Sequence, residues 1–420
     1  MTWPVKSLLL LPALCLLLAG CPTSVDKSTT PPVNPAATVI GMLQPLASGS
    51  SLEKELAARL AISEINAAGG VNGKPLDPTV TYDDNNNAIV GVPSAQALVN
   101  DGVVAIIGAN ASQVTIPVAE QVTIPADIAL ITPSSTSPAI STLADNNTVY
   151  RIPPSDNLQG TLLAQLVWNE GHTSVATFDQ NEPYGVGLTQ VFVQAFEKLG
   201  GTVTASVTAP LGQNSGYDTE IASLYANGTP GALMLFSFPE PTDNLLREIL
   251  TDKGSLPPLY GVDANMVTDT LSNAPPQIAG MRGTTPGADT GTPQYQHFLA
   301  AYTAAVGAMP DPNTENSYDA VYLIALAMEE SGANTRPAVL ARLNAVSQSG
   351  SSSGNIVVGP GGFASAIAAI QAGKTVGYLG ASGPLDFDAQ GDPTASTYHY
   401  LEVAPTATGL GLTTLAVINF

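Results

Sequence analysis

The amino-acid sequence predicts an α/β protein made of two lobes, each with a central and mainly parallel sheet. From residue 38 onward, short apolar segments of strand length alternate with longer helical patterns. This alternation is typical of strand–helix–strand units and parallel sheets. The same plan recurs later in the chain, which predicts two similar lobes instead of one large sheet.

The first stretch contains strand, helix, strand, helix and strand patterns, in that order, at residues 39–43, 52–67, 80–82, 94–100 and 103–107. In the first of these helices, Leu52, Leu56 and Leu60 follow a four-residue spacing, and Ile62 and Ile65 lie on another face. A helix with two apolar faces is expected to pack on more than one side.

The second stretch repeats this plan with a strand pattern at residues 175–178, a helix at 186–199 and a strand at 203–207. In both stretches the long helix is followed by a Gly-Gly pair, a common way for helices to end. Ligands of parallel sheets bind beyond the carboxyl ends of the strands. The loops that follow strands are therefore where polar binding residues are expected.

The N-terminal segment predicts export. Residues 8–19 form an apolar run that is too short to span a bilayer and has the length of a signal-peptide core. The run ends in Leu-Ala-Gly-Cys, which resembles the lipobox of bacterial lipoproteins. The resemblance implies a signal peptide at residues 1–20 and a diacylglycerol on Cys21, whereas the alternative is a buried apolar helix. Residues 21–37, rich in Pro, Ser and Thr, are expected to form a lipidated tether.

Composition excludes several classes of function. The formal net charge of −21 repels phosphate backbones, so nucleic acid is not an expected partner. The two cysteines are Cys15, inside the predicted signal peptide, and Cys21, so no disulfide is expected. His172, His297 and His399 are scattered singly, and neither a metal nor any other cofactor is expected.

A series of short motifs resembles the branched-chain amino-acid-binding family of periplasmic binding proteins. The motifs occur in the family's order between about residues 38 and 403, at residues 64–74, 82–84, 107–112, 131–138, 150–156, 178–185, 317–321 and 383–392. Examples are Ile-Gly-Ala-Asn-Ala-Ser at 107–112 and Tyr-Arg-Ile-Pro-Pro-Ser-Asp at 150–156. The resemblance implies a periplasmic binding protein of type I, with two Rossmann-like lobes and a three-crossover hinge, one crossover being the segment around Arg151.

The same resemblance gives limits for the parts of the chain. The implied limits are residues 38–154 and 283–375 for the first lobe, 155–282 and 376–404 for the second lobe, and 405–420 for a C-terminal tail.

In the first lobe the resemblance implies three ligand contacts. Ser112 matches the serine that hydrogen-bonds the ligand carboxylate, a role that suits a helix start, where backbone N–H groups attract anions. Ser134 matches a residue whose carbonyl meets the ligand ammonium, and Thr136 one whose hydroxyl and N–H meet the carboxylate. The alternatives are an N-cap for Ser112 and a turn closed by short hydroxyl side chains for Ser134 and Thr136.

In the second lobe, Tyr184 matches the tyrosine that closes over the ligand, and Asp263 an acidic residue that pairs with the ammonium. Core packing and an ordinary surface aspartate are the alternatives. The two halves together describe a clamp for a zwitterion, which an α-amino acid would satisfy. The loop at residues 44–51 departs from the family, because it lacks an aromatic residue that could stack on the ligand. Amides and other small carboxylates therefore remain open as ligands.

Two motifs that could indicate an enzyme or a metal site lack the sequence context that such a site requires. The sequence Gly-Ser-Ser-Ser-Gly at residues 350–354 matches a nucleophile elbow and is followed by Asp388 and His399, but a helical pattern precedes it and a strand pattern follows it. An elbow requires the opposite order. The acidic run at residues 83–87 lacks the spacing of a calcium loop. We therefore expect a binding protein and not an enzyme.

Two functions share this fold. One is an extracytoplasmic receptor that delivers a small molecule, an amino acid first, to the permease subunits of an ABC importer. The other is a sensory receptor that docks onto a signalling protein. The predicted lipid anchor and the lack of a transmembrane segment favour transport. The protein is expected to be a monomer. It is expected to be held at a bacterial membrane, in the periplasm or at the cell surface.

Overall fold

The structure is a computed structural model that describes residues 38–420 except 351–352 and 408. The predicted signal peptide, Cys21 and the tether at residues 21–37 lie outside the described residues. Within the described part of the chain, no helix has both the length and the apolar character needed to cross a membrane.

The first lobe is built on a five-stranded parallel sheet of order β2-β1-β3-β4-β5. Its strands are β1 (Gly41–Gln44), β2 (Val80–Asp83), β3 (Ala105–Gly108), β4 (Ala129–Thr132) and β5 (Val149–Arg151). The connections contain α1 (Gly49–Ala67), α2 (Ala88–Asn100), α3 (Ser112–Val118), a π turn η1 (Ala119–Thr123) and a 3₁₀ turn η2 (Ile140–Thr142). Because all strands run in parallel, their carboxyl ends meet at one edge of the sheet.

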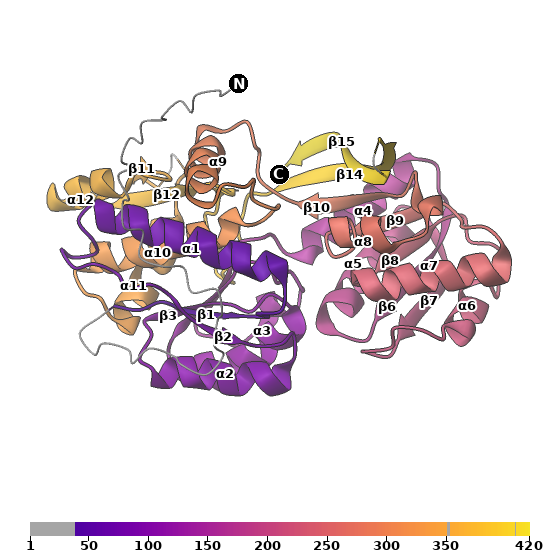
Figure 1. Ribbon diagram of the computed structural model, residues 1–420, viewed down its shortest axis with the longest axis horizontal. Coiled ribbons are helices and arrows are strands. Elements are labelled where there is room, and N and C mark those ends of the chain that lie inside the picture. The colour runs from indigo at the N-terminus through magenta and orange to yellow at the C-terminus, as the bar shows by residue number, and fades with distance from the viewer. Residues whose placement is uncertain (1–37, 351–352, 408) are drawn as a thin grey trace, which may run out of the picture. The chain divides into compact units, whose positions relative to one another are not determined.

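A later part of the chain completes this lobe. It consists of α9 (Pro293–Val306), α10 (Glu315–Ser331), α11 (Arg336–Ser347), α12 (Phe363–Gln371) and a small sheet of β11 (Ile356–Val358), β12 (Val376–Gly380) and β13 (Gly383–Pro384). In Figure 1 these orange elements lie beside the indigo α1. Helix α10 is buried from its first residue to Glu329, which makes it the central helix of the first-lobe core.

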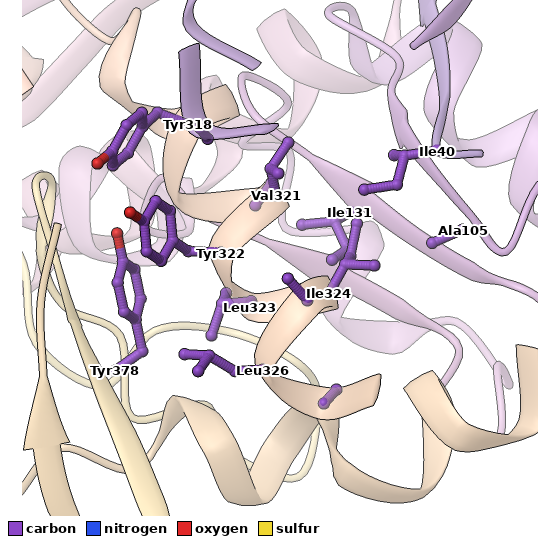
Figure 2. Packing of buried hydrophobic residues seen from close by; sticks show 14 of the residues in the cluster. Ile40, Ala105, Ile131, Tyr318, Val321, Tyr322, Leu323, Ile324, Leu326 and Tyr378 are labelled. Carbon is purple, nitrogen blue, oxygen red and sulfur yellow. The ribbon is translucent and has the colours of Figure 1, made fainter. Parts of the chain in front are cut away.

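Figure 2 shows how α10 fills this core. Val321 and Ile324 point toward Ile131 of the sheet, while Tyr318, Tyr322 and Tyr378 gather on the other side of the helix. The rings of Tyr322 and Tyr378 are stacked at 5.2 Å. Helix α10 thus joins the main sheet to the small one.

The second lobe is built on a seven-stranded sheet of order β15-β14-β10-β9-β8-β6-β7. Its strands are β6 (Ser174–Gln180), β7 (Thr202–Ala209), β8 (Leu233–Phe236), β9 (Leu259–Val262), β10 (Arg282–Pro286), β14 (Thr397–Thr406) and β15 (Gly409–Asn419). Helices α4 (Asp156–Asn169) and α5 (Pro183–Lys198) form one apolar cluster with it. Helices α6 (Asp218–Leu224), α7 (Pro239–Lys253) and α8 (Thr268–Asn273), with a 3₁₀ turn η3 (Pro276–Ile278), lie in another.

The chain passes between the two lobes three times: after β5, after β10 and before β14. The predicted fold class, with two lobes and mainly parallel sheets, is confirmed. The second passage comes later than the predicted limit at residue 282, because β10 belongs to the seven-stranded sheet. The third comes later than the predicted limit at residue 375, because Val376 and Tyr378 of β12 lie in the first-lobe core. Motifs fix the order of segments but not the residue at which a sheet ends.

Two local expectations differ from the structure. Residues 405–420, expected to form a tail, instead supply the end of β14 and the whole of β15, which pairs antiparallel with β14 at the edge of the sheet. Leu52, placed on an apolar face of α1, is 60% exposed. The buried face of α1 carries small side chains such as Ala57, Ala58 and Ala61, which let the helix approach its neighbours closely.

Candidate functional site

The loops after β3 and β4 hold the first-lobe candidates. Ser112 is the first residue of α3 and is 2% exposed. The N-cap of α3 is Ala111, which makes no side-chain capping bond. The hydroxyl of Ser112 instead accepts a hydrogen bond from the backbone N–H of Ser137 at 3.3 Å. The capping alternative for Ser112 is thus not what this geometry shows, because its side chain links two loops.

The loop after β4 is held by a hydrogen bond within the loop and by bonds from β5 and α4. Ser134 is half-buried, and its N–H donates to Thr132 Oγ1 at 3.3 Å. Thr136 is 2% exposed, and its carbonyl accepts from Arg151 Nη1 at 2.8 Å and from the N–H of Asp156 at 2.9 Å. Burial raises the pKa of Asp156, and the Thr136 hydroxyl lowers it, so this hydroxyl lies beside that carboxyl group.

A buried ion pair anchors this loop. Arg151, at the end of β5, is fully buried and bonds both carboxylate oxygens of Asp392, at 2.5 and 2.9 Å. Its Nη1 atom also donates to the carbonyls of Thr136 and Ser137. One guanidinium therefore joins the β4 loop to the segment of the third passage between the lobes.

The second-lobe candidates contact each other. The hydroxyl of Tyr184, in the first turn of α5, donates to Asp263 Oδ1 at 2.9 Å. Tyr184 is 4% exposed, and the ring of Phe238 lies 5.8 Å from its ring. Glu182 caps α5 by accepting from the N–H groups of Tyr184 and Gly185. The structure thus brings Tyr184 and Asp263 together at the carboxyl ends of β6 and β9.

Asp156 was missed by the sequence analysis. It is the first residue of α4 and fully buried, and within the described chain neither of its carboxylate oxygens has a hydrogen-bond partner of good geometry. Burial and then the charge of Asp263 raise its pKa, while the hydroxyl of Thr136 lowers it. Asp156 therefore lies between the candidates of the two lobes. Asp156 is the last residue of the motif Tyr-Arg-Ile-Pro-Pro-Ser-Asp. Because it follows the N-cap Ser155, the local sequence indicates only an ordinary helix start.

Two further buried polar groups adjoin this carboxyl pair. The hydroxyl of Tyr398 and the side-chain oxygen of Gln159 are fully buried and, in the part of the chain that is described, have no hydrogen-bond partner. Tyr398 lies within the field of both Asp156 and Asp263. Burial raises the pKa of Asp263, and Tyr184 and then Gln159 lower it; the amide nitrogen of Gln159 donates to the carbonyl of Thr284 at 2.9 Å. Strand β14 and helix α4 thus add polar groups that no local motif indicated.

The electrostatics of the site favour a positively charged group. Burial raises the pKa of Asp156 well above its usual range, and the charge of Asp263 raises it further. Burial also raises the pKa of Asp263, and raises that of Glu182 to about 7. Arg151 is the cation that acts on Asp156, but Asp392 already occupies it. A ligand ammonium would stabilise the charged form of both aspartates.

The lobes also meet beside this site. The hydroxyl of Ser137 donates to the carbonyl of Pro183 at 2.7 Å. A cavity of about 620 Å³ is lined by Ser137, Glu182 and Pro183, among others, and not by Ser112, Tyr184 or Asp263. The chain neighbours of Thr136 and Tyr184 therefore form the contact between the lobes.

The structure does not place the motif at residues 350–354 in the context of a nucleophile elbow. Helix α11 precedes residues 350–354 and β11 follows them, the reverse of a nucleophile elbow. Asp388 accepts from the N–H groups of Gln390 and Asp392, and His399 Nε2 contacts the carbonyl of Ala288. Asp388 is thus engaged in a turn and His399 in strand β14.

Comparison with known proteins agrees with the fold and the motifs. A model of the family described as periplasmic binding protein matches residues 38–366. A chemotactic signal transduction system substrate-binding protein, BasB of Halobacterium salinarum, is 27% identical over 84% of this chain and 84% of its own length. Leu/Ile/Val-binding protein homolog 1 of Brucella suis is 28% identical over 68% of this chain and 75% of its own.

Solved structures share the fold. The leucine binding protein LivK of Thermotoga maritima has a TM-score of 0.73 at 20% identity, covering 91% of this chain and 99% of its own. A solute binding protein of Rhodopseudomonas palustris, in complex with 3,4-dihydroxy benzoic acid, has a TM-score of 0.69 at 18% identity, covering 91% and 97%. The chain therefore belongs to the periplasmic binding protein family, and its two lobes have the type I fold that the branched-chain amino-acid-binding motifs implied.

Proposed function

We propose that this protein is the substrate-binding lipoprotein of an ABC importer, and that it binds an α-amino acid, or a similar small carboxylate, by closing two lobes around it. The observation that carries this proposal is the pair of Asp156, which is fully buried, and Asp263, which is half-buried. Among the described residues, the cation that acts on Asp156 is Arg151, which Asp392 already occupies. Such a pair suits a ligand ammonium, because a buried charge needs a partner.

The ligand carboxylate would meet Ser112 and the backbone N–H of Thr136, whose hydroxyl lies beside Asp156. Hydroxyl groups and backbone N–H groups at the carboxyl edge of a parallel sheet suit a carboxylate. Ser134 would contribute its carbonyl, and Tyr184 would close over the ligand from the second lobe. The relatives named for Leu/Ile/Val binding and the family's extracytoplasmic role support the proposal.

Closure of the hinge would couple ligand binding to a change in the conformation of the protein. Periplasmic binding proteins are among the proteins known to close by a hinge around a ligand, and binding energy that both lobes share shifts the equilibrium toward the closed form. The bond from Ser137 to Pro183 already joins the two lobes in this structure.

The test is a panel of α-amino acids, their amides and small aromatic acids, read by thermal unfolding. A ligand at about 100 times its Kd stabilises the fold by about 2.7 kcal/mol. We expect an α-amino acid to raise the melting temperature and its amide, which lacks the carboxylate, to do so less. A hit should also reduce the radius of gyration in small-angle scattering. Stabilisation by aromatic acids alone would contradict the zwitterion clamp.

Sensing is the second candidate function, and the similarity to BasB, named for chemotactic signal transduction, favours it. The fold and the ligand site would be the same, and the partner would be a signalling protein instead of a permease. Uptake of the labelled ligand by cells, with and without the gene, separates the two. Unchanged uptake together with a lost tactic response would favour sensing.

The lipid anchor is a separate proposal that rests on Leu-Ala-Gly-Cys at residues 18–21. Replacing Cys21 by serine should abolish labelling by radioactive fatty acid, because the thiol that carries the lipid is gone. The matched control is Cys15→Ser, inside the predicted signal peptide, which should keep the label. Labelling that persists in Cys21→Ser would show that the lipid is attached elsewhere, and an unlabelled wild type would show that there is no lipid anchor.

A further inference from the structure

At or just beyond the ends of three neighbouring strands of the first lobe, polar side chains have buried atoms without a hydrogen-bond partner among the described residues. Gln44 ends β1, Asp84 follows β2 and Asn110 comes soon after β3, and these strands are adjacent and parallel in the sheet. In the chain as described, Gln44 Nε2, Asp84 Oδ2 and Asn110 Oδ1 are buried and have no hydrogen-bond partner. Gln44 is 2% exposed and Asp84 is fully buried. The three atoms thus belong to one edge of the sheet.

A fourth such group comes from the start of α10. Glu315 is 2% exposed, and its Oε2 atom has no hydrogen-bond partner among the described residues. The next residue, Asn316, donates from Nδ2 to the carbonyl of Pro133 at 2.9 Å. This bond ties the start of α10 to the loop after β4, next to Ser134.

The charge of Glu315 is balanced locally. Lys54 of α1 is 7% exposed; burial lowers its pKa, whereas the charges of Glu315, Asp311 and Glu53 favour its protonated form. Burial raises the pKa of Glu315 to about 7, and Lys54 in turn acts to lower it. Of the three acids that act on Lys54, Glu315 is the buried one, since Asp311 is exposed and Glu53 is half-buried. The two buried charges are therefore of opposite sign, and this end of the site calls for no net charge from a ligand.

These groups adjoin the proposed carboxylate contacts. Asn110 lies two residues before Ser112, and its Nδ2 atom donates to Ser51 Oγ at 3.3 Å. Glu315 is linked through Asn316 to the loop that carries Ser134. A ligand held by Ser112 and Ser134 would therefore place its side chain near Gln44, Asn110 and Glu315.

We infer that the ligand's side chain is neutral and polar, a carboxamide or a hydroxyl that hydrogen-bonds to Gln44, Asn110 and Glu315. This inference rests on the proposed amino-acid clamp and names its substrate class. The unpartnered atoms comprise one donor, Gln44 Nε2, and acceptors on Asp84, Asn110 and Glu315, and a carboxamide can satisfy both kinds. An aliphatic side chain would leave them buried and unpaired, which is the basis on which hydrogen-bonding sites reject apolar analogues.

The test compares amino acids of nearly equal shape by calorimetry on the whole mature chain: asparagine with leucine, threonine with valine, and glutamine with methionine. At least one polar member should bind roughly five- to a hundred-fold more tightly than its apolar counterpart, the factor expected for one buried group left unpaired. Gln44→Met should reduce that ratio. Gln96→Met, an exposed glutamine on α2, is the control and should leave it unchanged.

The outcomes separate this inference from the proposal beneath it. Tighter binding of leucine, valine or methionine would overturn the polar side-chain site and leave the amino-acid clamp standing. Binding of none of the six would overturn both. An unchanged ratio in Gln44→Met, with a melting temperature that shows a folded protein, would also overturn the assignment of Gln44.

Discussion

Replacing Arg151 by methionine should lower the free energy of unfolding by about 3–5 kcal/mol, the cost of breaking a buried ion pair from one side. Arg151 is fully buried, and the side chain of Asp392 is 12% exposed. Methionine keeps much of the side-chain volume but supplies no donor. The carboxylate of Asp392 and the carbonyls of Thr136 and Ser137 would lose their charged partner.

Urea unfolding of the ligand-free protein measures this effect. The matched control is Arg59→Met on α1, where the ion pair with Glu55 is an exposed contact one helical turn away. That change should cost well under about 1 kcal/mol. Similar losses in the two variants would show that the Arg151 pair contributes no more than a surface contact does.

Periodicity could predict much of the fold, because each element carries its own signal. The helix patterns at 52–67 and 186–199 became α1 and α5, and the strand patterns around them became β1, β2, β3, β6 and β7, with ends that moved by a few residues. Residues 409–419, part of the predicted tail, instead form a strand, and Pro405 before them does not end the sheet. Proline is tolerated at the end of an edge hairpin, which is where the structure places it.

The site could be predicted only where a motif names a residue. Tyr184 and Asp263 were predicted separately, and the bond between them depends on strands β6 and β9 meeting in one sheet. The pairing of Arg151 with Asp392 joins segments far apart in the chain. Asp156 shows the limit most clearly. Among the described residues its carboxylate oxygens have no hydrogen-bond partner of good geometry, and this results from its burial, which no local sequence signal predicts.

Replacing Asp156 by asparagine should have opposite effects on affinity and on stability. If Asp156 pairs with a ligand ammonium, losing the charge from this buried contact should cost about 2–5 kcal/mol of binding, or more than roughly thirty-fold in Kd. The ligand-free fold should become more stable at pH 8. The folded-state pKa of Asp156 is raised by burial and by Asp263, so folding resists its ionisation, and asparagine has no charge to bury.

The pH dependence of the wild type gives an independent check. An acid whose pKa is raised on folding contributes stability that declines as pH rises from its unfolded value of about 4 through its folded value. Ligand-free stability should therefore decline over this range, while affinity for an amino acid improves, because the proton must leave before the ammonium pairs. Asp156→Asn should weaken both trends.

Calorimetry and thermal unfolding between pH 5 and 8 measure the two quantities on the same samples. The matched control is Asp179→Asn, a buried acid whose pKa burial also raises but whose Oδ2 atom is bonded by Thr189 within the second lobe. It should change stability and leave affinity within about two-fold, since contacts away from the ligand contribute little to binding. Equal losses of affinity in the two variants would mean that general acidity attracts the ligand, and the specific role of Asp156 would be abandoned. An Asp156→Asn protein that binds as tightly as the wild type would leave Asp263 as the sole candidate for the ammonium.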